Sequence, residues 1–300
     1  MPGGDRRRAL VVANPGARKG AEGLPEALGR LRTAGFEVAE GASTDPARIS
    51  DAIREGAGAA DLVIVGGGDG TLSAALPGLV DARLPVGVLP LGTANNLART
   101  LGIPTALGDA VDLIAAGRTR AIDLGRVNDR YFLTTASLGL SVRITEELSD
   151  DSKRRWGRMA YAQSALRVLR DARPFHAAIR YDGRTLETRT VQIVVGNGRF
   201  YGHAMTVAED ARIDDEHLDF YSIEARHWWR LLRLLPALRR GSHGRKREVR
   251  ALRTRVLTIE TRTPHDIDVD GEVGARTPAR FSVAPRALEV FAPPAEVAPG

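Results

Sequence analysis

The sequence predicts an α/β N-terminal domain with a parallel, doubly wound sheet, followed by a C-terminal antiparallel β-sandwich domain. Up to about residue 120, short apolar runs alternate with segments whose apolar residues recur at helical spacing. This is the pattern of repeated βα units. Beyond residue 120, apolar residues alternate with period two between turn dipeptides, which is typical of antiparallel strands. We expect domains at 1–120 and 121–292, the last strands packing back on the first domain, and a flexible tail at 293–300.

The first domain is expected to alternate strands and helices along the chain. The expected strands lie at 9–15, 36–40, 62–65 and the start of 85–100. The expected helices lie at 22–35, from Thr44 onward, from Thr71 onward and at 106–117. Repeated units of this kind form a parallel sheet covered on both faces, and they gather ligands at the carboxyl ends of the strands.

The second domain is expected to consist of hairpins and single strands. One hairpin is predicted between 121–127 and 131–139, and another between 176–181 and the strand at 191–195. Five further strands are expected at 218–224, 256–261, 266–272, 279–284 and 287–292. Two helical segments, 153–172 and 226–240, place tryptophans, leucines and other apolar residues between arginines. Such helices can cover the sandwich or lie at a bilayer interface.

Composition narrows the classes of function. There is no cysteine, which excludes disulfides and thiol catalysis, and the six histidines lack the spacing of a zinc site. No stretch approaches the ~20 apolar residues that span a bilayer, so we expect a cytoplasmic protein. The formal net charge is +6, but residues 226–255 hold eleven Arg or Lys and one acid. This local charge predicts peripheral contact with the anionic inner face of the membrane, and no nucleic-acid motif accompanies it.

The strongest candidate for a binding site is the stretch 61–72, DLVIVGGGDGTL. A buried strand, a glycine turn and a helix start form a phosphate-binding geometry, because glycine lets the backbone approach an anion and the helix offers N–H groups. Asp69 would repel phosphates unless a divalent cation stood between them. The loop therefore predicts a metal-bound nucleotide; the alternative is a tight turn without a ligand. The spacing matches neither the dinucleotide fingerprint nor the Walker motif.

Several motifs together resemble the diacylglycerol-kinase catalytic domain family, particularly its soluble bacterial lipid kinases, with sphingosine, ceramide and NAD kinases as wider relatives. The matching motifs occur in the family's order across nearly the whole chain: ANPGA at 13–17, VGGGDGTL at 65–72, PLGTANNLAR at 90–99, IDLG at 122–125, GNGRFYG at 196–202 and VDGE at 269–272. The resemblance implies an ATP- and Mg²⁺-dependent kinase. GGDGT alone is shared with NAD kinases, whereas GTANNLAR, GNGRFYG and DGE favour the lipid-kinase branch.

The resemblance also implies which residues form the site. The residues it places around ATP are Asn14, Pro15, Gly16, Ala17, Arg18, Thr44, Gly66, Gly67, Gly68, Asp69, Gly70, Thr71, Leu72, Thr93 and Asn95. A carboxylate of the final DGE motif serves as the base in the family, and here it is Asp270 or Glu272. Asp69 and Asp123 match acidic positions near the magnesium and the transferred phosphate; Asp123 can equally be a structural residue at the domain joint.

A separate structural magnesium is implied by a DDG turn of the bacterial kinases. It points to the carboxylate of Asp215 and to Arg212 and His217 as carbonyl donors. The glycine of that turn is replaced here by Glu216, at a position where glycine would permit a positive φ. Asn96 likewise stands where many relatives carry aspartate.

Phosphoryl transfer explains these residue types without the resemblance. The reaction needs held phosphates, neutralised charge and a group that accepts the alcohol proton. Asp69 lies in the first domain and Asp270 in the second, so we expect an interdomain cleft in which the γ-phosphoryl of MgATP passes to a lipid hydroxyl, diacylglycerol-like or another amphipathic alcohol. The alternatives are an NAD kinase and a noncatalytic ATP-binding module. Neither the lipid nor the oligomeric state follows from the sequence.

Overall fold

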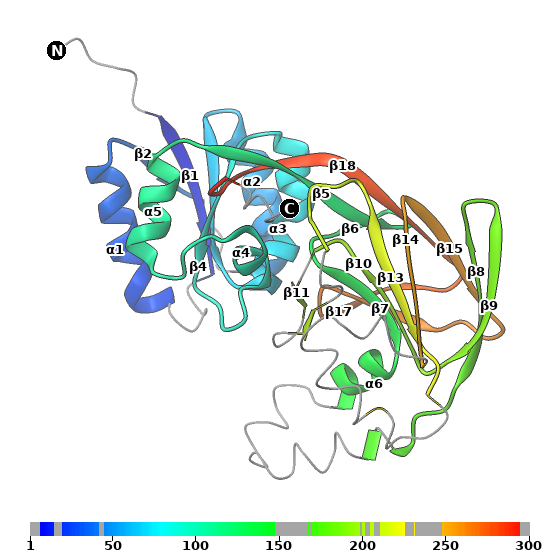
Figure 1. The fold of residues 1–300 in the computed structure, drawn as a ribbon. Coiled ribbons are helices and arrows are strands. Elements are labelled where there is room, and N and C mark those ends of the chain that lie inside the picture. The colour runs from blue at the N-terminus through cyan, green and yellow to red at the C-terminus, as the bar shows by residue number, and fades with distance from the viewer. Residues whose placement is uncertain are drawn as a thin grey trace. The chain divides into compact units, whose positions relative to one another are not determined.

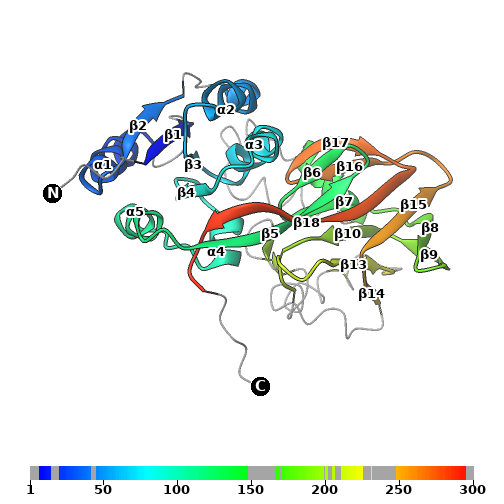
Figure 2. The ribbon, with the colours of Figure 1, turned by 90° about the horizontal axis from the view of Figure 1, so that it is seen from above.

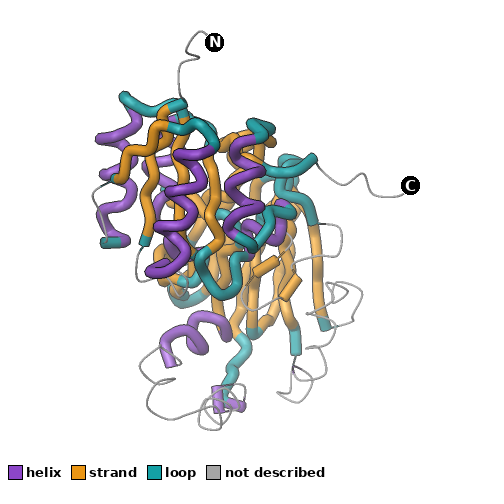
Figure 3. The backbone as a smooth tube through the Cα atoms, turned by 90° about the vertical axis from the view of Figure 1, so that its left-hand side faces the viewer, coloured by secondary structure: helices purple, strands orange, loops and turns teal. Residues whose placement is uncertain are grey.

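The computed structural model divides the chain into two compact units, unit 1 with Met1–Leu124 and Pro285–Gly300, and unit 2 with Gly125–Ala284. The residues that the structure describes are 7–14, 20–41, 45–147, 167–168, 170–198, 200–201, 205–206, 211–225, 231 and 248–294. Unit 1 is an α/β unit and unit 2 is built mainly from antiparallel strands (Figures 1 and 3). The predicted fold class is therefore confirmed.

Unit 1 contains a parallel sheet in the order β2-β1-β3-β4-β18 (Figure 2). Its strands are β1 (Arg8–Ala13), β2 (Glu37–Glu40), β3 (Leu62–Gly67), β4 (Val86–Pro90) and the last part of β18 (Ala279–Phe291). β1 pairs with β2 and β3, β3 with β4, and β4 with Val290 of β18, each in parallel. β3 and β4 are buried along their whole length, which explains their uninterrupted apolar sequences.

Helices cover both faces of this sheet. The helices are α1 (Gly20–Thr33), α2 (Ile49–Ala57) after the short 3₁₀ helix η1 (Pro46–Arg48), α3 (Asp69–Ala82), α4 (Asn96–Leu101) and α5 (Leu107–Ala115). α1 contacts α5 and α2 contacts α3. Figure 2 shows these two pairs on opposite sides of the strands, which is the doubly wound arrangement expected from the sequence.

A serine hydroxyl of α2 forms hydrogen bonds with the backbone of α3. The Ser50 hydroxyl donates to the carbonyl of Ala74 at 2.7 Å and accepts the N–H of Gly78 at 3.1 Å. Ser50 thus contacts both the carbonyl and the N–H of an i, i+4 pair of α3 beside Pro77, which lies inside the helix and has no N–H to donate. A Cβ on Gly78 would lie 2.5 Å from the carbonyl oxygen of Ser50, so glycine permits this close packing.

Unit 2 contains two sheets. The first holds the early part of β18, β15 (Val256–Thr261), β8 (Phe175–Tyr181) and β9 (Arg184–Thr190), and the hairpin of β5 (Thr119–Val127) and β6 (Arg130–Phe132) joins it where β5 pairs with β18. The second sheet holds β14 (Val249–Thr254), β13 (Leu218–Ile223), β10 (Gln192–Gly196), β7 (Thr135–Gly139), β16 (Asp266–Val269) and β17 (Glu272–Arg276). β11 (Phe200–Tyr201) and β12 (Met205–Thr206) form a separate pair, and α6 (Leu140–Glu147) follows β7.

Alternate residues of both sheets form one core. From the second sheet, Ile193 and Val195 of β10 and Leu218 and Phe220 of β13 point into it. The first sheet contributes the corresponding alternate residues Ala177, Ile179, Leu257, Ile259, Ala279 and Phe281. Residues two apart share a face of a strand, so two inner faces meet as in a sandwich.

The outer face of the second sheet is also partly covered. Val194, Tyr221, Ile223 and Val249 form a second buried cluster there with Leu231. Leu231 is the described residue of the arginine-rich segment 226–240, and its side chain therefore packs on the sandwich. The rest of that segment, most of 153–172 and residues 241–247 lie outside the described residues.

Several strand predictions need correction. The single strand expected at 266–272 divides into β16 and β17 at the turn formed by Asp270 and Gly271. β8 pairs with β9 and not with 191–195, because the Thr190 hydroxyl binds the carbonyls of Gln192 and Ile223 and β10 continues in the other sheet. The expected strand 131–139 divides into β6 and β7, and 279–284 with 287–292 form one strand of 13 residues.

Candidate active site

The glycine loop lies at the carboxyl end of β3, as predicted. β3 ends at Gly67, Gly68 is the N-cap of α3, and the helix begins at Asp69, two residues earlier than expected. The N–H of Leu72 donates to the carbonyl of Gly68 at 3.1 Å. An acidic residue in the first turn interacts favourably with the helix dipole, which explains why α3 begins at Asp69. The first amides of this 14-residue helix lack intrahelical partners and can bind an anion.

A second loop meets the first through glycine backbone. Gly92 follows β4, and a Cβ on Gly92 would collide with the Cα of Gly68. The N–H of Leu91 also donates to the carbonyl of Gly67 at 3.0 Å. Glycine is needed at this contact because any side chain would push the two loops apart. The carboxyl ends of two neighbouring parallel strands therefore form one glycine-lined edge.

Asp69 holds the start of α4. Its Oδ1 accepts the N–H of Asn96 at 2.6 Å and that of Leu97 at 3.4 Å, and its Oδ2 accepts from Asn96 Nδ2 at 3.3 Å. These donors are the first amides of α4, which a carboxylate stabilises. Asp69 thus has a structural contact in addition to any role toward phosphate.

The two threonines of the loops differ in exposure. The Thr71 side chain lies against Gly67, where a Cβ would collide with it, and the residue is 7% exposed. Thr93 is exposed. Of the two predicted threonines, Thr93 is the more accessible to solvent. Leu72 is a core residue, so its contribution to a site is limited to the backbone.

Asn95 shapes the second loop. Its φ of 48° lies in the left-handed region, where asparagine is better tolerated than most residues. Its side chain accepts the N–H of Gly92 at 3.1 Å and donates to the Gly92 carbonyl at 3.0 Å. Both contacts join Asn95 to Gly92 within the same loop, so they fix the position of Thr93, which lies between these two residues.

Asn14 follows β1, and its N–H donates to the carbonyl of Gly66 at 3.0 Å. This contact brings the end of β1 to the glycine edge. The other predicted nucleotide-binding residues, Pro15, Gly16, Ala17, Arg18 and Thr44, lie outside the described residues.

Asp123 is 2% exposed on β5, and its Oδ1 accepts the N–H of Arg286 at 2.7 Å. Arg286 follows Pro285 in β18 and has a φ of 51°. The carboxylate therefore stabilises a strained position in a long strand, consistent with the structural alternative considered for this residue.

Asp270 lies in the two-residue turn between β16 and β17. Val269 pairs with Glu272, and Asp270 and Gly271 have φ values of 52° and 99°, the pattern of a type I′ hairpin. The Asp270 carboxylate accepts four donors: the N–H groups of Leu133 (2.7 Å), Thr134 (2.9 Å) and Thr135 (3.1 Å), and the Thr134 hydroxyl (2.7 Å). These amides are available because β6 ends before them and β7 begins at Thr135.

Asp270 is half-buried as a residue, but its carboxylate is turned inward onto these donors. Burial raises the pKa of the Asp270 carboxyl above its usual range, and the hydrogen bonds from Thr134 and Leu133 oppose that shift. The contacts engage both oxygens and fix the turn to the segment 133–135.

Glu272 has a different environment at the start of β17. Its side chain is 66% exposed and pairs with Arg130 of β6 at 3.2 Å. A Cβ on Gly274 would collide with the Arg130 guanidinium, so glycine leaves the space in which Arg130 lies. Two neighbouring carboxylates therefore have opposite surroundings: Asp270 is enclosed and anchored, and Glu272 is accessible.

Two residues that the sequence analysis did not assign to the site support it. Arg130 pairs with Glu272, and Asn197 donates from Nδ2 to the Leu133 carbonyl at 3.1 Å and from N–H to the Thr134 carbonyl at 2.9 Å. Asn197 belongs to the GNGRFYG motif, so that motif was the available signal. Nothing in the sequence near Arg130 indicated its pairing.

The predicted metal ligands lie in the turn before β13. Asp215 Oδ1 accepts the N–H of His217 at 3.0 Å, and its Oδ2 pairs with Arg253. The Arg212 side chain pairs with Asp214 at 3.2 Å. Across the described part of the chain, no three Asp, Glu or His side chains stand close enough to hold a metal ion. The magnesium assignment at this turn stays a prediction.

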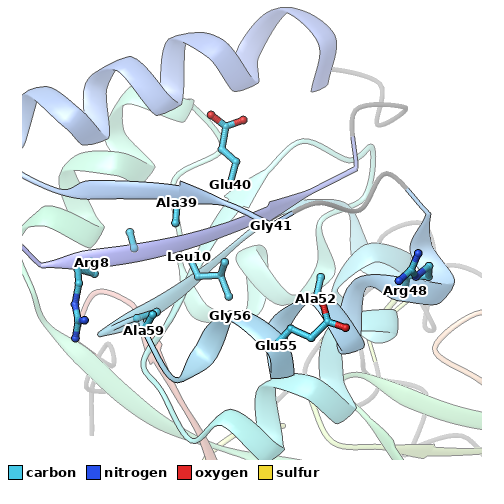
Figure 4. A pocket seen from close by; sticks show the side chains of 12 residues that line it. Arg8, Leu10, Ala39, Glu40, Gly41, Arg48, Ala52, Glu55, Gly56 and Ala59 are labelled. Carbon is cyan, nitrogen blue, oxygen red and sulfur yellow. The ribbon is translucent and has the colours of Figure 1, made fainter.

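A cavity of about 350 Å³ lies in unit 1 between β2 and α2 (Figure 4). Small side chains, Leu10 and the carboxylates of Glu40 and Glu55 line it, with Arg8 at one end and Arg48 at the other. A second cavity of about 220 Å³ in unit 2 is lined by Leu140, Phe175 and His265, among others. Neither contains a residue predicted for the site.

Two family models match the chain. The diacylglycerol kinase catalytic domain matches residues 8–127, and the YegS C-terminal NAD kinase beta sandwich-like domain matches residues 134–292. The glycine-lined edge lies within the first match and the β16–β17 turn within the second. Together the two matches define a lipid kinase with a catalytic α/β domain and a β-sandwich domain.

Named relatives agree over nearly the full length. Diacylglycerol kinases from Staphylococcus aureus strains bovine RF122 / ET3-1 and MRSA252 are each 30% identical over 296 residues, which cover 96% of this chain and 93% of the relative. A solved diacylglycerol kinase from Bacillus anthracis str. Sterne superposes with a TM-score of 0.80 at 25% identity, covering 97% of this chain and 99% of that one. The chain belongs to the diacylglycerol kinase family.

The prediction of a lipid kinase of this family is thereby confirmed. Among the described residues, no helix combines the length and apolar character needed to cross a bilayer.

Proposed function

We propose that this kinase transfers the γ-phosphoryl group of MgATP to the hydroxyl of a diacylglycerol-like lipid. The main support for nucleotide binding is the glycine-lined edge, where Gly68 and Gly92 meet and α3 begins. Backbone amides at such an edge favour phosphate oxygens because no side chain blocks their approach. The exposed Thr93 hydroxyl lies in the same loop and can donate to a phosphate.

Asp69 is the carboxylate that we assign to magnesium in unit 1. Magnesium is usually held through one or two carboxylates together with substrate phosphates and water, so a single aspartate beside a phosphate loop fits it. Bound there, the ion would neutralise charge on the phosphates. The contacts with Asn96 and Leu97 fix the direction of the Asp69 carboxylate before a nucleotide arrives.

We assign proton abstraction from the lipid hydroxyl to Glu272. A general base must reach the proton that it removes, and the Glu272 side chain is 66% exposed. Asp270 uses both carboxylate oxygens on the segment 133–135, so we assign it a positioning role that fixes the turn carrying Glu272. Arg130 pairs with the Glu272 carboxylate and limits the directions that it can take.

Asp123 is assigned a structural role in this proposal, since its carboxylate holds the N–H of Arg286 at the strained position in β18. The basic segment 226–255 is proposed to bind the anionic membrane surface that contains the lipid through its basic residues before β14, because Arg250, Arg253 and Arg255 pair with acidic side chains. Clusters of basic residues near a membrane contribute roughly 1 kcal/mol per charge. Binding of the full chain to anionic vesicles, measured against salt concentration, tests this part, and binding to neutral and anionic vesicles alike would contradict it.

The test of the reaction is transfer of label from γ-labelled ATP into an organic-extractable product. The assay uses the full chain with diacylglycerol in mixed micelles, with and without magnesium, and a parallel reaction with NAD and no lipid. Magnesium-dependent label in the organic phase supports the proposal, and chromatography identifies the product. Label only in the NAD reaction would contradict it, as would transfer that is unchanged by EDTA.

A further inference from the structure

The segment 214–219, which comprises a turn and the start of β13, is rich in acidic residues, and each of its acids has an arginine partner. Asp214 pairs with Arg212 at 3.2 Å, Glu216 with Arg255 at 2.7 Å, and Asp215 and Asp219 both pair with Arg253. Asp214, Asp215 and Asp219 have side chains that are only 15 to 18% exposed. Partly buried carboxylates require compensation of their charge, and here arginines supply it.

Asp215 is the centre of this arrangement. One carboxylate oxygen accepts the N–H of His217 at 3.0 Å and the other pairs with Arg253. The carbonyl of Asp215 also lies 2.6 Å from His217 Nδ1. Both carboxylate oxygens of Asp215 are therefore engaged by protein donors, and one of these donors is a positively charged guanidinium, which neutral amide donors such as those at Asp69 do not provide.

Strand pairing brings Arg253 to this position. β13 and β14 are antiparallel, and Asp219 and Arg253 stand directly opposite each other. Directly opposed residues of an antiparallel pair have neighbouring side chains. The guanidinium lies 3.8 Å from the Asp219 carboxylate and reaches on to Asp215. A planar guanidinium has five N–H donors on three nitrogens, so different nitrogens can pair with two carboxylates at once.

Glu216 adopts the left-handed backbone conformation that glycine usually adopts in such a turn. Its φ is 58°, in the left-handed region that is unfavourable for residues with a Cβ. The Glu216 carboxylate pairs with Arg255, the residue that follows β14. Arg253 and Arg255 thus bind two consecutive acids of the turn from one short segment.

We propose that the Arg253 guanidinium takes the place of a divalent cation at the Asp215 turn, so that this turn is held to β14 by ion pairs and folds without metal. The positive charge is covalently part of the chain and its position is set by the register of β13 and β14. Removal of Arg253 would leave the carboxylates of Asp215 and Asp219 without their shared counter-charge, and a divalent cation would then bind between them.

The test uses the full chain without nucleotide and measures the melting temperature in excess EDTA and in millimolar MgCl₂. We expect wild type and Asp215→Asn to change equally between the two conditions. Arg253→Met should melt lower than wild type in EDTA and should regain part of the loss in MgCl₂, and the double variant with Asp215→Asn should not regain it. Arg250→Met is the matched control, because Arg250 also lies on β14 and pairs with Glu224 at 2.6 Å.

Two results would overturn the proposal. One is a wild-type melting temperature that rises in MgCl₂ by an amount that Asp215→Asn abolishes, because the turn would then bind magnesium with Arg253 in place. The other is an Arg253→Met variant as stable in EDTA as Arg250→Met. The first comparison uses only wild type and Asp215→Asn, so it decides the matter even where Arg253→Met does not fold.

Discussion

Asp69 in unit 1 and Asp270 in unit 2 use the same chemistry to different extents. Each carboxylate accepts backbone N–H groups from a segment distant in the sequence, 96–97 for Asp69 and 133–135 for Asp270. Asp69 binds two amides and one side-chain amide at the start of α4, whereas Asp270 binds three amides and a hydroxyl. Both aspartates therefore link two parts of their own unit.

The two aspartates differ in which accessible group lies beside them. Asp69 stands in the first turn of α3, beside the exposed Gly70, and our proposal places the phosphates of the nucleotide there. Asp270 is turned inward, and the accessible carboxylate of its turn belongs to Glu272. The DGE motif of this chain thus contains one enclosed carboxylate, that of Asp270, and one accessible carboxylate, that of Glu272. Four measurements sharpen or break this comparison.

The largest expected effect on stability is that of Asp270→Ala. It leaves three backbone N–H groups and a hydroxyl without their acceptor, at a cost of about 3 kcal/mol or more. Thermal or urea unfolding measures this cost, and kinase turnover should fall as well. Asp129→Ala is the control, because Asp129 lies in the hairpin turn between β5 and β6 with a side chain that is 99% exposed. A cost no greater than that of the control would refute the anchoring role.

Asp69→Ala should have a smaller effect on stability and a large one on turnover. Loss of a helix cap costs about 1 kcal/mol, and loss of a group near the transferred phosphate should lower turnover about 100-fold or more. Unfolding and label transfer are measured on the same preparation. Asp81→Ala, in the last turn of the same helix and paired with Arg54, should leave turnover near that of wild type. Wild-type turnover in Asp69→Ala would remove Asp69 from the site.

The stability contribution of Asp270 should depend on pH. Burial raises the pKa of its carboxyl above the unfolded value, so the folded protein binds the proton more tightly than the unfolded chain. The stability that comes from this difference in proton binding is fully present below the unfolded pKa and is lost as pH rises through the folded pKa. The melting temperature of wild type minus that of Asp270→Asn should therefore decrease from about pH 4 toward neutral pH. A difference that is constant or increases with pH would contradict this environment for Asp270.

The α/β unit was largely predictable from its sequence. Leu62 to Val65 form an apolar run that leads into glycines, and β3 is buried along its length and ends at Gly67. The elements of the first unit could be predicted from local periodicity, because each strand is followed in the sequence by the turn and the helix that belong to it. The start of α3 at Asp69 was missed because an N-terminal acid in a glycine-rich stretch gives little signal of helix.

For the second unit, the antiparallel fold class could be predicted from the sequence, but the pairing of its strands could not. Thr190 and the break between β6 and β7 direct consecutive strands into different sheets, and period two is the same in either sheet. The pairing of Glu272 with Arg130 spans 142 positions, so no local pattern contains it. The DGE motif located the carboxylates, but only their surroundings separate Asp270 from Glu272.

The most direct test of the account is Glu272→Gln, which should have the smallest effect on stability of all these variants. Removing an exposed ion pair costs little, within about 0.5 kcal/mol, while loss of a general base lowers turnover about 100-fold to 10,000-fold. Glu260→Gln is the control, because Glu260 also forms an exposed pair with an arginine, Arg180 at 2.9 Å. We expect an unchanged melting temperature with turnover lost in Glu272→Gln alone. Wild-type transfer of label to diacylglycerol by Glu272→Gln would contradict the assignment of the base.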